Sequence, residues 1–147
     1  MELTASVNII SQTRTRNAAG ADATASLFFV TEFYAKGEDS GMPNHTGAGW
    51  LVHTQDDRGL FYENFVLALL ESRACVGWQW FKYQDNDPDD PHAEASNRDS
   101  NKGIVDRFYK PYSPLLARMH ELNRKMYGVS DVIDSADVQA ATKDHLH

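Results

Sequence analysis

The residues with the clearest chemical potential are one glutamate and two tryptophans. The stretch LFFVTEFYAKG, residues 27–37, places Glu32 at the exit of an apolar run. The stretch CVGWQWFKY, residues 75–83, places Trp78 and Trp80 two positions apart. A carboxylate can act as a nucleophile or as an acid–base group. Tryptophan offers an apolar face to the C–H side of a sugar ring and an N–H group to its hydroxyls, so these residues indicate a saccharide site.

Two apolar runs alternate with two amphipathic segments, and this order predicts how the candidate residues are positioned. Residues 27–34 and 75–83 have the length and composition of buried strands. Residues 56–73 predict a connecting helix, and residues 111–129 predict a second helix. A strand–helix–strand crossover returns the chain in the same direction, so the strands should be parallel. Because loops at the carboxyl ends of parallel strands carry the chemistry, we expect Glu32 at the active face.

Spacing also predicts which helical residues face the core. In the first helix the expected buried stripe is Leu60, Phe61, Phe65, Ala68, Leu69 and Ser72, widened by Val66, Leu67 and Leu70. In the second helix it is Leu115, Met119, Leu122 and Met126.

Long polar loops follow both predicted strands and supply the other candidate ligands. Residues 36–50 carry four glycines and one proline, and residues 84–103 are acidic and rich in asparagine. Asp and Asn side chains suit hydrogen bonding to vicinal hydroxyls, and aromatic rings can form the walls of a cleft. The expected saccharide-binding residues are Tyr34, Trp50, Trp78, Trp80, Asp85, Asn97 and Asp99.

Composition bounds the class of protein and its partners. A length of 147 residues fits one domain, and a net charge of -7 argues against a nucleic-acid partner. No apolar run approaches the roughly 20 residues that cross a bilayer, and no basic segment marks an export signal, so no membrane partner is expected. The single cysteine, Cys75, excludes an internal disulfide. The acidic run at 85–90 lacks the glycine and glutamate of an EF-hand, and the histidines show no HExxH, so no metal or cofactor is expected.

The sequence predicts three regions. Residues 1–26 are small and polar without a clear period and are expected to form an irregular leader, although ASVNII within them could form a short strand. Residues 27–134 are expected to form the folded domain. Residues 135–147 are expected to form a flexible tail.

Four blocks of the sequence together resemble the C-terminal end of the β-agarases of glycoside hydrolase family 50. In chain order, between about residues 28 and 127, they are VTEFYAKGEDSGMPNHTGAGW, DRGLFYENF, VGWQWFKYQDNDP and SNRDSNKGIVDRFYKPYSPLLARMHELN. The resemblance implies an α/β fold that is part of a (β/α)8 barrel, namely strand 7, helix 7, strand 8 and helix 8. It also implies retaining cleavage of β-1,4 links in agarose, with Glu32 matching the nucleophile at the end of strand 7. A periplasmic or extracellular location would accompany this function.

The resemblance places the second catalytic carboxylate on the fourth barrel strand, and this sequence offers no counterpart for it. A complete barrel has roughly 250 residues, so two predicted strands correspond to about a quarter of one. We therefore expect little or no hydrolase activity from the chain alone, as in a truncated form or fragment. The sheet edge and apolar helix faces left exposed favour the missing barrel half, or self-association, as a partner.

Three functions remain open from the sequence. The first is an agarase-like glycoside hydrolase, or its inactive remnant, with agarose or galactan oligosaccharides as substrate. The second is a non-catalytic carbohydrate-binding module that uses Trp50, Trp78 and Trp80. The third is an unrelated small α/β domain whose tryptophans are structural.

Overall fold

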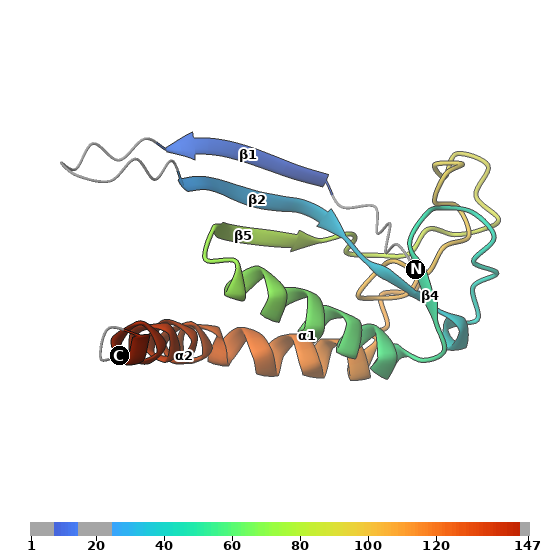
Figure 1. The fold of residues 1–147 in the computed structure, drawn as a ribbon. Coiled ribbons are helices and arrows are strands. Elements are labelled where there is room, and N and C mark those ends of the chain that lie inside the picture. The colour runs from blue at the N-terminus through green and yellow to red at the C-terminus, as the bar shows by residue number, and fades with distance from the viewer. Residues whose placement is uncertain (1–7, 15–24, 145–147) are drawn as a thin grey trace.

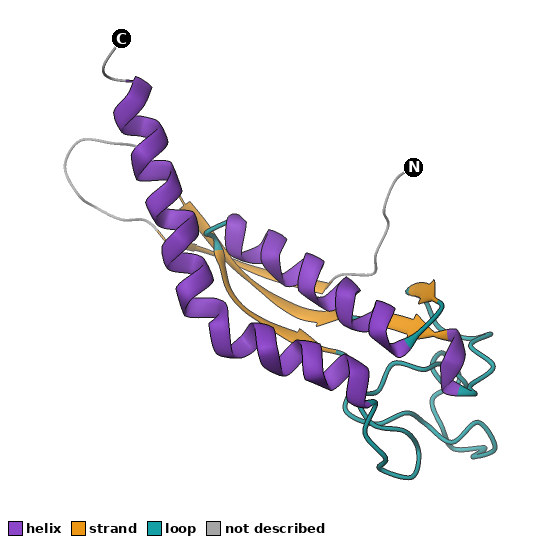
Figure 2. Cartoon of the chain, turned by 90° about the horizontal axis from the view of Figure 1, so that it is seen from below, coloured by secondary structure: helices purple, strands orange, loops and turns teal. Residues whose placement is uncertain are grey.

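The computed structural model describes residues 8–14 and 25–144 of the chain. A three-stranded sheet of order β1-β2-β5 carries two helices on one face, and the loops gather at one end (Figures 1 and 2). The strands are β1 (Asn8–Arg14), β2 (Ala25–Phe33), β3 (Ala35–Gly37), β4 (Trp50–Val52) and β5 (Cys75–Trp80). The helices are the short 3-10 helix η1 (Glu38–Ser40), α1 (Gln55–Glu71) and α2 (Ser113–Asp144).

The central strands β2 and β5 are parallel, as the sequence predicts. Phe28 pairs with Cys75, and Phe33 at the end of β2 pairs with Trp80 at the end of β5. In Figure 1 both strands point toward the loops, and α1 returns the chain from one strand to the other. Beyond β2 the chain forms β3, which pairs in parallel with β4 in a separate two-stranded sheet. The carboxyl ends of β2 and β5 therefore lie side by side at the loop end of the molecule.

Strand β1 corrects the expectation of an irregular leader, since it pairs with β2 along residues 8–14. The rest of residues 1–24 lies outside the described residues. The pairing is antiparallel, with Asn8 opposite Glu32 and Arg14 opposite Ala25. All strands of a (β/α)8 barrel are parallel, so the antiparallel β1 does not have the direction of a barrel strand.

Helix α1 forms where it is predicted, but its buried face differs. Thr54 caps the helix in a capping box, since its hydroxyl accepts from Asp57 N and the Asp57 carboxylate accepts from Thr54 N. The buried positions are Gln55, Arg58, Gly59, Tyr62, Val66 and Leu69. Leu60, expected in the core, is 41% exposed. The apolar pattern misjudges the face because the helix turns polar and small residues inward, where they meet the loops.

Helix α2 is longer than predicted. It continues to Asp144, through most of the segment from Ser135 that is expected to be a flexible tail. Its predicted apolar stripe is confirmed at Leu115, Met119 and Leu122, which are buried. The core between the sheet and the helices consists of Val30, Phe33, Tyr62, Val66, Leu69, Leu115, Met119 and Leu122. Neither helix, over the part of the chain described, has the length and apolarity of a membrane span.

Candidate active site

Glu32 lies one residue before the end of β2, at the loop end of the sheet. The neighbouring Phe33 points into the core, where its ring stacks on Phe65 with 4.4 Å between centroids. Val30 and Phe33 are three positions apart and both lie in the core, because the pairing of β2 with β5 is irregular between them. Tyr34, which follows Phe33, is buried. The candidate nucleophile therefore lies in this irregular segment, near the carboxyl end of a parallel strand.

A buried lysine, which the sequence does not single out, lies next to this position. Lys102 is 2% exposed, and its Nζ lies 3.9 Å from the centroid of the Tyr34 ring. The same amino group donates to Oδ1 of Asn97. Asn97, a predicted saccharide ligand, is 8% exposed, and its side-chain oxygen accepts this hydrogen bond from Lys102. Gly49 lies against the Tyr34 ring so closely that an added Cβ would lie 2.3 Å from its Cε2.

The electrostatics link these groups to Glu32. Burial lowers the pKa of Lys102 to about 8, and the negative charge of Glu32 opposes this fall. Burial raises the pKa of Tyr34, and the charges of Glu32 and Glu94 raise it further. Glu32, Tyr34, Asn97 and Lys102 therefore form one electrostatic cluster, called here the Glu32 cluster.

Asp85 is a structural carboxylate and not the hydroxyl ligand expected from the sequence. It is 3% exposed. Its Oδ1 accepts from the backbone N of Lys102 at 2.8 Å and of Gly103 at 2.6 Å. Its Oδ2 accepts from Asn101 Nδ2 at 2.7 Å and from the Tyr112 hydroxyl at 2.8 Å. Burial and Asp85 together raise the pKa of Tyr112. The carboxylate fixes the loop that carries Lys102.

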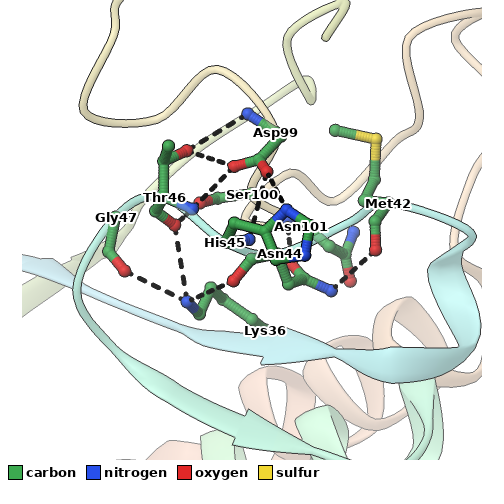
Figure 3. Close-up of polar contacts among 9 residues, drawn as sticks. All are labelled: Lys36, Met42, Asn44, His45, Thr46, Gly47, Asp99, Ser100 and Asn101. Atoms are coloured by element: carbon green, nitrogen blue, oxygen red, sulfur yellow. Dashed lines mark hydrogen bonds and ion pairs between the residues drawn. The ribbon is translucent and has the colours of Figure 1, made fainter.

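Asp99 joins the two long loops, as Figure 3 shows, and does not stand free to line a cleft. Its carboxylate accepts from the backbone N of His45 at 3.1 Å and of Thr46 at 2.8 Å. Burial alone would raise its pKa, but these hydrogen bonds and that from the Thr46 hydroxyl lower it. From the other side of the same loop, Lys36 Nζ donates to Gly47 O at 3.0 Å and to Asn44 O at 3.3 Å.

Trp78 and Trp80 pack against the core between the sheet and the helices. Trp78 Nε1 donates to the Tyr62 hydroxyl on α1 at 3.0 Å. The Trp80 ring meets Phe33 edge-on at 5.4 Å, and its Nε1 donates to Lys102 O at 2.9 Å. Both indole N–H groups are therefore engaged within the protein, and the saccharide-binding role of these residues stays a prediction.

Trp50 lies on β4, paired with Ala35 of β3, and is partly buried. Its Nε1 is buried and, within residues 8–14 and 25–144, makes no hydrogen bond. The structure therefore places Trp50 beside the chain that continues from Glu32 and Tyr34. Its saccharide-binding role stays a prediction.

Arg58 is a second buried cation, and the pattern of apolar residues in the sequence does not predict its burial. It is 0% exposed on α1. Its Nε donates to Ala35 O at 2.8 Å and its Nη2 to Gly103 O at 2.9 Å. The guanidinium lies 5.5 Å from the ring centroids of both Trp80 and Tyr112. Burial lowers its pKa to about 10, and Asp85 opposes this shift. The sequence signal for this role was a charged residue inside a predicted helix, directly after the N-terminal aspartates Asp56 and Asp57.

No group of three or more His, Cys, Asp or Glu residues in the described parts of the chain is placed to hold a metal ion. The side chains of the Glu32 cluster offer a carboxylate, a phenol, an amide and an amine.

Comparison with solved structures identifies similar folds. The crystal structure of BpGH50 aligns with 72% of this chain at a TM-score of 0.62 and 43% sequence identity. The structure of an exo-β-agarase aligns with 69% of the chain at a TM-score of 0.58 and 26% identity. An agarase named AgWH50C has the same TM-score at 22% identity, which shows likeness of fold alone. No protein-family model matches the sequence, and no curated protein matches it.

The aligned regions are small parts of these larger proteins. The chain spans 21% of BpGH50, 13% of the exo-β-agarase and 15% of AgWH50C. The match to BpGH50 also excludes the reading as an unrelated small α/β domain. The resemblance noted in the sequence is thus confirmed, and this chain is structurally related to the GH50 agarases, of which it corresponds to a part.

Proposed function

We propose that this chain supplies part of the active site of an agarase-like, retaining glycoside hydrolase. Its substrate class is agarose or a related galactan with β-1,4 linkages. The observation that carries the proposal is the position of Glu32: it lies one residue before the end of a parallel strand, and its charge acts on the buried cation Lys102, in a chain that aligns with GH50 structures. The units β2, α1, β5 and α2 would then be the last two βα units of the barrel.

In this proposal Glu32 is the nucleophile. Its ionised carboxylate attacks the anomeric carbon, the glycosidic C–O bond breaks, and a glycosyl ester forms on Glu32. A second carboxyl group, about 5 to 5.5 Å away in retaining enzymes, protonates the leaving oxygen. That group then takes a proton from the water that hydrolyses the ester. The first step requires Glu32 in its ionised form.

Five carboxylates in the described segments that follow β2 and β5 are engaged with other groups of the chain. Asp85 and Asp99 bind backbone N–H groups of their own loops. Asp39 accepts from Gln55 N and Nε2, and Asp87 pairs with Arg107 at 2.8 Å. Glu38 bonds to His53 at 2.7 Å. We therefore infer that the acid–base residue comes from barrel units outside this chain, and that the chain alone has little hydrolase activity.

The carbohydrate-binding module built on three tryptophans has weaker support. Two of its three residues, Trp78 and Trp80, face α1 and bond to groups of the protein. A flat binding surface made by these side chains is therefore absent from the described residues.

The nucleophile is tested by grafting. The part of BpGH50 that aligns with this chain is replaced by the chain's own residues, because 43% identity favours a compatible core. Agarose hydrolysis is then measured for the graft with Glu32, with Glu32→Gln and with Glu32→Ala. We expect Glu32→Gln to lower kcat at least about 1,000-fold. Azide should rescue Glu32→Ala, since a small anion replaces the missing nucleophile.

Glu38→Gln is the matched control, because Glu38 is a second glutamate at the same loop end, on the surface. It should leave kcat within about twofold, since no step of the proposed reaction uses it. Folding of each graft is verified by circular dichroism. A folded, active graft that keeps its activity with Glu32→Gln would overturn the proposed role.

A further inference from the structure

A cleft of about 380 Å³ lies apart from the Glu32 cluster. Its walls come from residues 40–43, 88–89 and 106–108 and from Tyr112, and none of these belongs to that cluster. The volume falls within the range of about 300 to 1,000 Å³ found for small-molecule sites. The lining combines the apolar side chains of Met42, Pro43 and Pro88 with carboxylates and a guanidinium.

An exposed aromatic ring, that of Phe108, lines this cleft. Phe108 is 73% exposed, which is unusual for a large apolar side chain. The Arg107 guanidinium lies 4.8 Å from the ring centroid, and Arg107 in turn bonds to Asp87 at 2.8 Å. Asp106 accepts from the backbone N of Phe108 and of Lys110, both at 2.8 Å. The turn is thus fixed without a ligand, and this lowers the entropic cost of binding to the ring.

The charges of the cleft favour a neutral ligand. Arg107 is the cation of the lining, and it lies 3.7 Å from Asp89 in addition to its bond with Asp87. Asp106 adds a further carboxylate. The guanidinium is therefore already neutralised, and a phosphate or sulfate would meet a net negative surface. A sugar suits the site better, because its C–H face can stack on Phe108 while its hydroxyls bond to Asp89, which is 91% exposed.

We propose that the cleft beside Phe108 is a second saccharide-binding site, which takes a neutral galactan oligosaccharide outside the Glu32 cluster. The choice of galactan rests on the proposed function, whereas the position and the preference for a neutral, hydroxyl-rich ligand rest on the cleft alone. Such a site would hold a polysaccharide chain on the protein without taking part in bond cleavage.

The full 147-residue chain is titrated with an agarose-derived tetrasaccharide, and amide chemical shifts are followed by NMR. We expect shifts at Met42, Asp89 and Phe108. Phe108→Ala should weaken binding about tenfold, a loss of roughly 1.4 kcal/mol. Tyr127→Ala is the matched control, since Tyr127 is an aromatic residue of α2 that is 76% exposed and does not line the cleft. Both side chains are on the surface, so both variants should keep the wild-type fold, which their spectra verify.

Further arms separate this proposal from the proposed function. Binding should be unchanged in Glu32→Gln and insensitive to salt between low and high NaCl, since the ligand carries no charge. Chemical-shift changes confined to residues around Glu32 would contradict binding in the cleft and would leave the glycosidase proposal standing. Three further results would each contradict the second saccharide-binding site: equal affinities of Phe108→Ala and wild type, a strong salt dependence, or no binding of the tetrasaccharide. The graft assay on Glu32 does not depend on any of these outcomes.

Discussion

The amino group of Lys102 contacts an aromatic ring and an amide, and it interacts electrostatically with a carboxylate. The Tyr34 ring covers it at 3.9 Å, Asn97 accepts its hydrogen bond, and Glu32 is the nearby anion that most favours its charge. Its backbone is held by Asp85. Burial lowers the pKa of Lys102 to about 8, so at pH values where its amino group is charged this buried charge destabilises the folded chain.

This environment predicts how stability depends on pH. Between about pH 8 and 10 the folded chain has released the Lys102 proton, whereas the unfolded chain still holds it. The free energy of unfolding should therefore rise with pH in this window, by up to about 3 kcal/mol from this group. Lys102→Met should flatten the rise, as measured by urea denaturation at a series of pH values.

Lys125→Met is the control for this measurement, because Lys125 is exposed on α2 and pairs with Glu121. It should leave the slope unchanged. Lys36 and Lys82 also have lowered pKa values through burial, so part of the rise should persist in Lys102→Met. A slope identical to wild type in Lys102→Met would show that Lys102 is not the titrating group.

At the level of elements, Arg58 connects three segments that lie far apart in the sequence. It belongs to α1, and it bonds to Ala35 of β3 and to Gly103 in the loop before α2. It also bonds to Gln55, which reaches Asn101 at 2.9 Å. This side chain therefore sets the position of the loop that carries Lys102 relative to β3, which follows β2 in the chain.

Arg58→Lys should be strongly destabilising. Lysine keeps the charge but cannot reach two carbonyls and Gln55 in the forked geometry of a guanidinium, so buried acceptors lose their donors. We expect a loss of about 3 kcal/mol or more in the free energy of unfolding, measured with urea at pH 7. Arg124→Lys, a surface change on α2, should cost less than about 0.5 kcal/mol. Equal stabilities of the two variants would contradict this role.

At the level of the whole molecule, α1 and α2 cover one face of the sheet (Figures 1 and 2). The order β1-β2-β5 makes β5 an edge strand of the described sheet. Val76 on this strand is 63% exposed. In the GH50 structures the aligned region is a small part of a larger protein, which offers more chain to cover such surfaces. An uncovered edge with apolar side chains tends to pair with another chain.

We therefore expect the isolated chain to self-associate through β5 at high concentration. Val76→Lys should increase the monomeric fraction in sedimentation velocity, because an edge lysine opposes strand pairing. Val132→Lys, at a comparably exposed apolar residue of α2, is the control and should have a smaller effect. A monomeric wild-type chain across the concentration series would contradict this prediction.

Particular residues show where prediction from sequence succeeds and where it fails. The alternation of apolar runs predicts β2, α1, β5 and the start of α2, because burial of apolar surface sets these elements. The same rule fails on α1, where Arg58 and Gln55 are buried and Leu60 is exposed. Hydropathy does not include hydrogen bonds that a distant loop supplies. For β1 the sequence indicates only a short strand in ASVNII, whereas the strand continues through polar residues to Arg14, because it pairs with an edge that only the folded sheet provides.

The sequence by itself determined the parallel βα order, the place of Glu32 at a strand end and the relation to the GH50 agarases. Each of these depends on local pattern or on matching residues along the chain. Only the tertiary structure decided that Trp78 and Trp80 face α1, that Asp85 and Asp99 hold loops together, and that Lys102 lies beside Tyr34. The physical reason is that the side-chain period of a strand shows which residues share a face. Which face meets the helices, and which loop covers the strand end, depends on contacts between distant segments.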